Sequence, residues 1–349
     1  MGKNGAYSNL FREAQFSADG TTIVTHSEDE FLRTFILPPD LLDDRTSPSK
    51  LEAYSEIQSP TSTLSYSLYP HFDLQNSATT LALAASKDVP LSLRNALHYE
   101  TIHASYPLID APREAFVTPH ALTWTSDGTH FLAGSKDQIA IFDASRDGEG
   151  PEAVHKTAPG RTAKKLYGAQ DINSCKGIVS TLSISSDGLL AAGTLDRNIG
   201  LFDHSGFQDC STAFSLSFSL DGSARDGTGI NHLHWSPCGK YLIVAERQSD
   251  SIHVYDVRST HRRVCRLSGR RAATTQKLGF DVLPASKSTS GLEVWAGGTD
   301  GCVRKWVVNA GIDVEEEASE QAPDLETNMH DGECELIILV LACSPTIIR

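Results

Sequence analysis

Seven cationic side chains gather in one stretch of 20 residues, and they are the residues of this sequence best suited to chemistry. They are Arg258, Arg262, Arg263, Arg266, Arg270, Arg271 and Lys277. No acid lies between Val257 and Phe280, so the stretch carries a local charge of +7. Arginine suits phosphate because its planar guanidinium donates hydrogen bonds in pairs and stacks on bases. The stretch predicts phosphate contacts to a nucleic acid. The alternative is a solvated loop whose arginines pair with nearby acids or with the acidic segment 313–335.

The remainder of the sequence is acidic. Its 349 residues include 30 Lys and Arg against 44 Asp and Glu, a formal charge of −14. Ten of these acids lie in segment 313–335, which has no Lys or Arg, so the sequence outside this segment carries −14 + 10 = −4. A protein that coats nucleic acid indiscriminately needs a broadly positive surface, and this composition excludes that class.

Catalytic and metal-binding motifs are absent from the sequence. It contains no G-x-S-x-G elbow, no phosphate-binding G-x-x-x-x-G-K-[ST] loop, no H-E-x-x-H pair and no G-x-G-x-x-G after a strand. His232 and His234 share one face of an expected strand and could ligate a metal, but no third ligand is near them in sequence. We therefore expect no catalytic residue, no metal, no cofactor and no small-molecule substrate, and we expect a protein that is not an enzyme.

The seven cysteines indicate a reducing compartment, either the cytosol or the nucleus. Their number is odd and the closest pair, Cys334 and Cys343, is nine residues apart, which predicts neither a disulfide framework nor a CxxC site. The longest apolar run, Leu336 to Cys343, has eight residues, whereas a membrane helix needs about 20. No apolar stretch follows the N-terminal Met1 as in a secretory signal. We expect no membrane partner.

The elements that would position these side chains come from an internal repeat. The clearest unit, 121–143, has three short apolar strands at 121–124, 131–135 and 139–143. The first two are joined by Ser126-Asp127-Gly128, and Asp137 lies in the second turn. Similar units cover 179–203 and 230–256, and weaker ones cover 14–35, 64–93 and 278–306. Alternation with a period of two and Asp-Gly turns indicate antiparallel hairpins, and no stretch shows a long helical period.

Several such small sheets bury their apolar faces only by packing radially, so the repeat predicts an all-β propeller of the WD40 type. The aspartates of the second turn are Asp29, Asp88, Asp137, Asp196, Asp250 and Asp300, at intervals of 59, 49, 59, 54 and 50 residues. We predict that their carboxylates accept hydrogen bonds from the turn backbone. WD40 repeats usually span about 40–45 residues, so the longer pitch predicts long loops, notably at 38–60, 144–176, 204–228 and 259–276.

Six blades are recognisable of an expected seven, and they divide the sequence into three parts. Residues 1–10 are an N-terminal segment, 11–306 hold blades 1 to 6, and 307–349 hold the acidic segment and an incomplete or aberrant seventh blade. One apolar strand, 336–341, follows the acidic segment and then the sequence ends. We expect either imperfect closure of the ring or an altered C-terminus.

Several strings resemble the telomerase Cajal body protein family, WD40 proteins also called WD repeat proteins antisense to the tumour suppressor p53. Phe16–Gly20 with Arg33–Leu41 looks like the first blade of that family, including its Leu-Pro-Pro-Asp-Leu ending. The most specific match is Asp256-Val257-Arg258 with 271–277 and Phe280-Asp281. The weaker matches are Tyr66–Leu68, 84–91, 177–180 and 200–202. The similarity covers about residues 11–306, and the sequence is similar to a fungal-type member.

The resemblance implies an RNA-binding scaffold in the nucleus, in a body like the Cajal body, with a cytoplasmic pool as a further expectation. Its partners would be telomerase RNA or small Cajal-body RNA and the proteins of those particles, with a role in their localisation or assembly. A fungal relative is tied to pre-mRNA splicing, so the alternative is a protein-interaction platform for spliceosomal proteins without direct RNA contact. A propeller face can stack and read the exposed bases of an RNA loop.

Overall fold

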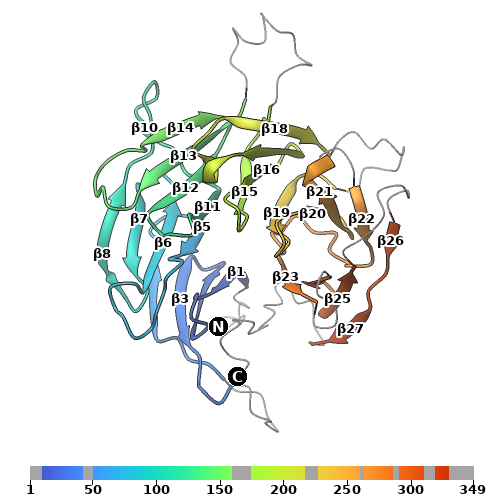
Figure 1. The fold of residues 1–349 in the computed structure, drawn as a ribbon. Helices are drawn as coiled ribbons and strands as arrows, with labels where there is room; N and C mark the ends of the chain where they lie inside the picture. The colour runs from blue at the N-terminus through green and yellow to red at the C-terminus, as the bar shows by residue number, and fades with distance from the viewer. Residues whose placement is uncertain are drawn as a thin grey trace, which may run out of the picture.

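The computed structural model describes residues 10–41, 50–158, 174–216, 227–259, 263–285, 291–309 and 319–329. Its regular structure is almost entirely β-strand, with two three-residue 3-10 helices, η1 (His204–Gly206) and η2 (Val257–Ser259). Neither described helix has the length or apolar character that crossing a bilayer requires. Figure 1 shows the strands as small sheets arranged around a common axis.

Six antiparallel sheets follow one another along the sequence, and we call them blades 1 to 6. Blade 1 has β1 (Phe11–Phe16), β2 (Thr22–Ser27), β3 (Phe31–Ile36) and β4 (Ser55–Gln58). Blade 2 has β5 (Thr63–Leu68), β6 (Leu81–Ser86), β7 (Leu91–Asn95) and β8 (His98–Tyr106). Blade 3 has β11 (Ala121–Trp124), β12 (His130–Ser135), β13 (Gln138–Asp143) and β14 (Ala153–Lys156). A separate hairpin of β9 (Ile109–Asp110) and β10 (Ala115–Phe116) precedes blade 3.

The second half of the protein repeats this order. Blade 4 has β15 (Val179–Ile184), β16 (Leu190–Thr194), β17 (Asn198–Phe202) and β18 (Cys210–Ser215). Blade 5 has β19 (Ile230–Trp235), β20 (Tyr241–Glu246), β21 (Ile252–Asp256), β22 (Arg263–Leu267) and the added β26 (Ser319–Gln321), which runs parallel to β22. Blade 6 has β23 (Phe280–Pro284), β24 (Leu292–Gly297), β25 (Cys302–Val308) and β27 (Leu325–Asn328). The predicted all-β propeller of the WD40 type is confirmed, with six blades.

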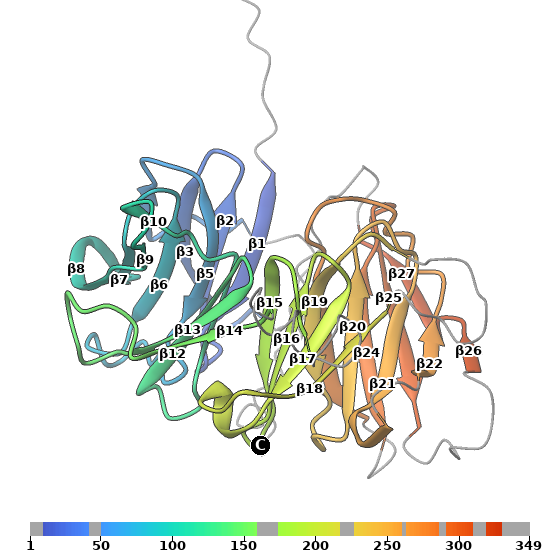
Figure 2. The ribbon, with the colours of Figure 1, turned by 90° about the horizontal axis from the view of Figure 1, so that it is seen from above.

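The strands run along the propeller axis, and the first strand of each blade lies closest to it (Figures 1 and 2). The connections between blades and the hairpins between second and third strands therefore lie at one end of the axis. We call this end the cavity face, and the other end the opposite face. The hairpins between first and second strands lie at the opposite face. They use the predicted Asp-Gly turns, in which Gly20 and Gly128 have φ of 69°, a conformation open to glycine.

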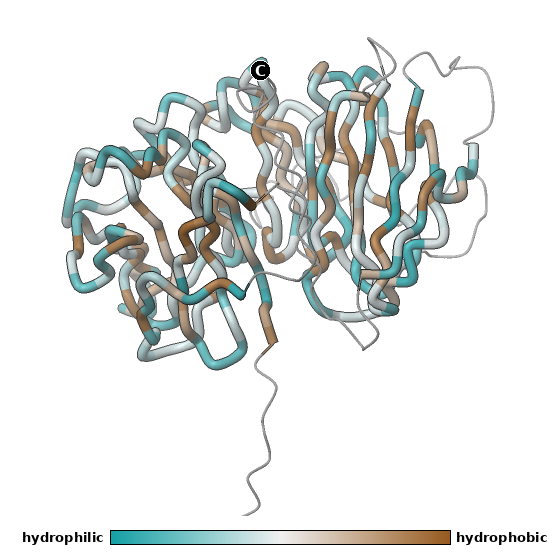
Figure 3. The backbone as a smooth tube through the Cα atoms, turned by 90° about the horizontal axis from the view of Figure 1, so that it is seen from below, coloured by the Kyte–Doolittle hydropathy of each residue, from teal (hydrophilic) through white to brown (hydrophobic). Residues whose placement is uncertain are grey.

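The core consists of apolar clusters between consecutive blades. One cluster joins blades 5 and 6 around Val254 and Trp306, and another joins blades 2 and 3 around Leu83 and Phe131. Three more join blades 1 and 2, 3 and 4, and 4 and 5. In Figure 3 the hydrophobic residues follow the strands, and hydrophilic residues gather at the turns. Each sheet thus buries apolar residues against at least one neighbouring sheet, as the repeat predicted.

Polar contacts reinforce these interfaces. The hydroxyl of buried Tyr66 in blade 2 donates to the carbonyl of Val24 in blade 1 over 2.7 Å. Between blades 4 and 5, the Arg197 guanidinium donates to the Glu246 carboxylate, with Nη2 and Oε1 3.0 Å apart. Arg197 and Glu246 are both buried. Between blades 1 and 6, Lys277 Nζ lies 3.4 Å from Glu13 Oε1.

Blade 6 extends past Trp306 into the acidic segment. Its outer strand β27 pairs antiparallel with β25, and Arg304 lies opposite Glu326 in the register. Because Arg304 is buried and pairs with the Glu326 carboxylate at 3.1 Å, the arginine draws part of the acidic segment onto the sheet. The incomplete seventh blade is expected within 307–349. Of that range, β26 and β27 belong to the sheets of blades 5 and 6, and 310–318 and 330–349, which include the apolar strand 336–341, lie outside the described residues.

Candidate binding site at the central cavity

A cavity of about 350 Å³ opens along the axis at the cavity face. Blades 1, 2, 4 and 5 contribute to its wall, for example through Glu13, Leu64, Ser180 and Asn231, and His120 contributes from the connection into blade 3. Lys277, from the connection into blade 6, completes this wall. The cavity is therefore a product of the ring as a whole, and no short sequence motif contains it.

Bulges in the innermost strands supply part of the cavity lining. In blades 1, 2, 4 and 5 the pairing register of the first two strands shifts by one residue near the start of the first strand. The skipped residues are Arg12, Leu64, Ser180 and Asn231, and all four line the cavity. A bulge leaves its extra residue out of the ladder and re-aims its side chain. These residues were not predicted from the sequence, although their shared place at the start of each repeat is a signal.

The cavity wall carries both signs of charge. Its charged residues are Arg12, Glu13, Glu28, Arg247 and Lys277. Two histidines also line it, and burial lowers the pKa of both His26 and His120, with the positive charge of Arg247 adding to the effect on His120. Both imidazoles are thus predominantly neutral at pH 7. The wall therefore has one positive charge in excess, from three cations and two acids.

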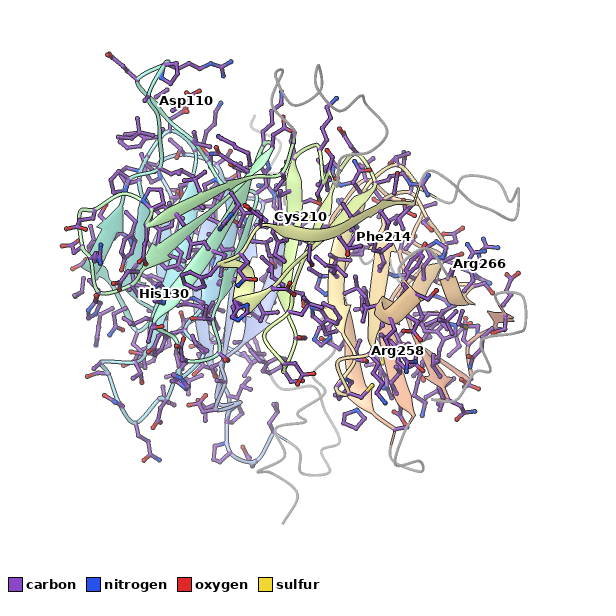
Figure 4. All side chains as sticks on the ribbon, turned by 45° about the horizontal axis from the view of Figure 1, so that its top comes forward. Asp110, His130, Cys210, Phe214, Arg258 and Arg266 are labelled. Carbon is purple, nitrogen blue, oxygen red and sulfur yellow. The ribbon has the colours of Figure 1, made fainter. Side chains whose placement is uncertain are left out.

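The basic stretch does not form one patch. Strand β22 (Arg263–Leu267) crosses blade 5 from the opposite face to the cavity face. Arg258 and Arg263 therefore lie toward the opposite face, whereas Arg271 and Lys277 lie at the cavity face. Figure 4 shows Arg266 on the outer rim of blade 5, apart from Arg258. Closeness along the sequence therefore does not keep these cations on one face, because strand β22 separates them.

Arg270 is a buried member of this basic stretch. Its side chain is 1% exposed, and its guanidinium donates to the carbonyls of Gly297, Leu278 and Gly279 at 3.2, 3.0 and 2.7 Å. Burial lowers the pKa of the guanidinium to about 10, so the side chain remains charged at pH 7. These donors hold the connection between blades 5 and 6, and the buried side chain is not presented to a phosphate.

The other described cations of the stretch are more accessible and pair with acids. Arg258 Nη2 lies 2.6 Å from Asp256, Arg266 Nη1 lies 3.6 Å from Glu320, and Arg271 Nη1 lies 3.3 Å from Asp300. Lys277 pairs with Glu13 across the blades. Arg263 lies half-buried at the start of β22, and Arg262 lies outside the described residues. The contact from Arg266 to Glu320 in β26 is the pairing with the acidic segment that the alternative interpretation expected.

Comparisons with known proteins support the resemblance. No family model matches the sequence. Human telomerase Cajal body protein 1 is 25% identical over 302 residues, which are 85% of this chain and 50% of that protein. Protein SWT21 of Kluyveromyces lactis is 28% identical over 300 residues, which are 83% of this chain and 67% of that protein. The guanine nucleotide-binding protein negative regulator 1 of Schizosaccharomyces pombe is 31% identical over 302 residues, which are 85% of this chain and 70% of that protein. The protein belongs to the telomerase Cajal body protein family.

This member of the telomerase Cajal body protein family spans about half the length of the mammalian relatives it matches. The matched 302 residues of the human relative correspond to most of the present sequence. The comparison therefore concerns the propeller, which makes up most of the described residues.

The six turn aspartates of this family member differ in their hydrogen-bond partners and in the backbone conformation of their turns. Asp29 and Asp300 accept hydrogen bonds from the backbone N–H two residues on, at 3.2 and 3.3 Å. Asp137 and Asp250 accept instead from the next blade connection, from the N–H groups of Gly177 at 2.8 Å and of Ala272 at 2.7 Å. Asp88 has a left-handed backbone with φ of 60°. Asp196 precedes the left-handed Arg197 in its turn.

Among the described residues, one trio of potential metal ligands lies close together, namely Asp300, Cys302 and Glu326, with ligand atoms within 4.8 Å. Both carboxylates already bind the guanidinium of buried Arg304. This contact also lowers the pKa of Asp300 to about 2. The arginine supplies the positive charge of this cluster, and its contact with Glu326 joins β25 to β27 in blade 6.

Proposed function

We propose that the protein is a non-enzymatic WD40 scaffold of a nuclear ribonucleoprotein, which binds a small RNA of the telomerase or Cajal-body class and the proteins of that particle. The observation that carries this proposal is the similarity to telomerase Cajal body protein 1 over 302 residues, which is most of the present sequence. The proposal places the protein in the nucleus, where such particles assemble.

The RNA contact would use the cavity face, because accessible cations of the basic stretch lie there. The side chain of Arg271 is 67% exposed and that of Lys277 is 33% exposed. Their acidic partners compete only weakly with a phosphate, since exposed ion pairs contribute about 0–1 kcal/mol. Arg258, Arg262, Arg263 and Arg266 remain secondary candidates for phosphate contact, and the burial of Arg270 assigns it to the fold.

A salt titration tests the phosphate contacts. The affinity of the full-length protein for a single-stranded loop RNA is measured at salt concentrations from about 50 to 200 mM, for the wild type and for Arg271→Gln/Lys277→Gln. Each lost phosphate contact should flatten the slope of log K against log salt by roughly 0.7–0.9. A matched control is Arg113→Gln/Arg146→Gln, which removes two exposed cations away from the cavity. Equal slopes for all three proteins would remove Arg271 and Lys277 from the RNA contact.

Crosslinking in cells tests the ribonucleoprotein role itself. Ultraviolet crosslinking followed by sequencing of the bound RNA should enrich a small set of structured nuclear RNAs. Adducts with protein only would contradict direct RNA binding.

The ion pairs favour a second candidate function, an interaction platform linked to pre-mRNA splicing that does not touch RNA. Each of the four accessible cations already forms an ion pair with a carboxylate, and these cations are Arg258, Arg266, Arg271 and Lys277. Carboxylates on an acidic surface of a partner protein could replace these carboxylates as the partners of the four cations. Crosslinks from these positions to spliceosomal proteins, with no RNA recovered, would support this function over the first.

A further inference from the structure

Arg247 is a cation at the cavity without a partner among the described residues. It lies in the turn between β20 and β21 of blade 5, and its side chain lines the cavity. Its guanidinium makes no hydrogen bond or ion pair with the residues that the structure describes, and its Nε is shielded from solvent. The neighbouring Glu246 carboxylate belongs to the interface with Arg197 of blade 4. A partly buried guanidinium that lacks an acceptor loses hydration without compensation.

Asn231 presents the complementary group in the same blade. It is a bulge residue of β19, it is 3% exposed, and it lines the cavity. Its Nδ2 donates to the carbonyl of Gln276 at 3.3 Å, but its buried Oδ1 has no partner within the described part of the protein. Ile230 pairs with Glu246, and Asn231 and Arg247 flank this pair of the ladder on opposite sides, with both residues lining the same cavity. The wall of this cavity therefore offers one cationic donor and one buried acceptor, both from blade 5.

We propose that the central cavity binds a peptide segment through a single carboxylate, which pairs with Arg247 while an amide N–H of the same segment donates to Asn231. An aspartate, a glutamate or the last residue of a polypeptide supplies a carboxylate and an amide N–H within one residue. Leu64 and Leu195, which also line the cavity, would pack against the apolar part of the segment. This inference goes beyond the proposed RNA scaffold and does not depend on it.

Charge favours a peptide over an RNA strand at this place. Lys277 is paired with Glu13, and Arg12 is paired with Glu30 at 2.8 Å, so Arg247 is the cation of the wall without an acid among the described residues. One carboxylate balances one guanidinium. An RNA strand would bring successive phosphates toward Glu13 and Glu28, which would repel them.

A peptide selection tests this site. A random heptapeptide library displayed on phage is selected on the full-length protein and counter-selected on Arg247→Gln. We expect a consensus with one Asp, Glu or C-terminal carboxylate. A synthetic consensus peptide should lose roughly ten- to a hundredfold in affinity when Arg247 is replaced, because the pair is a charge-assisted hydrogen bond. Replacing the acidic residue of the peptide by its amide should lower the affinity by the same factor, and this measurement uses the unchanged protein.

Matched controls make the outcome decisive. Arg146→Gln removes an exposed cation elsewhere and should leave peptide affinity unchanged. A selection without an acidic consensus, or peptides that bind Arg247→Gln equally well, would overturn the proposal. Loss of loop-RNA binding in Arg247→Gln without any peptide consensus would overturn it as well, and would assign the cavity to RNA. The RNA contacts of the proposed scaffold are tested separately, by the salt titration of Arg271→Gln/Lys277→Gln.

Discussion

Replacing Arg270 by methionine should destabilise the protein far more than the same replacement at Arg271, although the two residues are adjacent. Arg270 is 1% exposed and its guanidinium donates to three backbone carbonyls. Arg271 is 67% exposed and makes one ion pair, to Asp300. Methionine keeps most of the volume of the arginine stem, so the comparison isolates the loss of the hydrogen-bond donors.

The magnitude follows from the acceptors that the replacement leaves behind. A buried carbonyl without a donor, such as that of Leu278, costs about 1–3 kcal/mol, and the partly buried carbonyls of Gly279 and Gly297 cost less. The variant no longer buries a cation, and the desolvation penalty that disappears offsets part of this loss. We therefore expect Arg270→Met to lower the free energy of unfolding by about 3 kcal/mol. The exposed ion pair of Arg271 contributes less than about 1 kcal/mol, so Arg271→Met should be nearly neutral.

Urea unfolding followed by tryptophan fluorescence measures both values, since buried Trp306 reports on the same interface. Its indole N–H donates to the carbonyl of Ser268 at 3.2 Å, two residues before Arg270. Loop-RNA affinity, measured where both variants are folded, should fall for Arg271→Met and remain unchanged for Arg270→Met. Equal stability of the two variants, or a selective loss of RNA affinity in Arg270→Met, would refute the structural role of Arg270.

Three further predictions concern stability. Arg197→Met removes the arginine partner of buried Glu246 and should cost about 3–5 kcal/mol, whereas Arg197→Met/Glu246→Met should recover much of this loss in a double-mutant cycle. Gly193→Ala should cost about 1–3 kcal/mol in urea unfolding, because the added Cβ would lie 2.7 Å from Ile230 across the blade interface. The pKa of Asp300 is lowered to about 2 from 3.8, so its stabilisation is present above pH 3.8 and lost as pH falls toward 2. Asp300→Asn should therefore show a shallower loss of stability over that window in acid titration.

The sequence predicted the sheets well because the period of two and the turn residues are local signals. The unit 121–143 appears as β11, β12 and β13 with nearly the expected limits. Even the weaker unit 64–93 forms β5, β6 and β7. The outer strands were harder to predict, since strands such as β27 are exposed at every residue and carry no apolar alternation. Their place depends on pairing with a distant strand, as between Arg304 and Glu326.

The cavity residues could not be predicted from local pattern, because a bulge depends on the ladder between two strands. Asn231 and Ser180 look like ordinary strand residues in the sequence, and only the register shift separates them from their neighbours. Arg247 lies outside the basic stretch, and Glu246 is its one charged neighbour within two residues. Tertiary geometry brings it to the axis.

The division of the basic stretch between two faces changes what its charge can do. A segment of 20 residues holds seven cations, but a strand that crosses the blade separates them. On the cavity face, Arg271 and Lys277 are balanced in part by Asp300 and Glu13. Such a face attracts a polyanion only weakly over long range, so the salt dependence of RNA binding should reflect a few phosphate contacts and not the whole stretch. Recognition of an RNA then has to come from individual groups of this face, and single replacements of Arg271 or Lys277 should matter more for RNA affinity than the net charge.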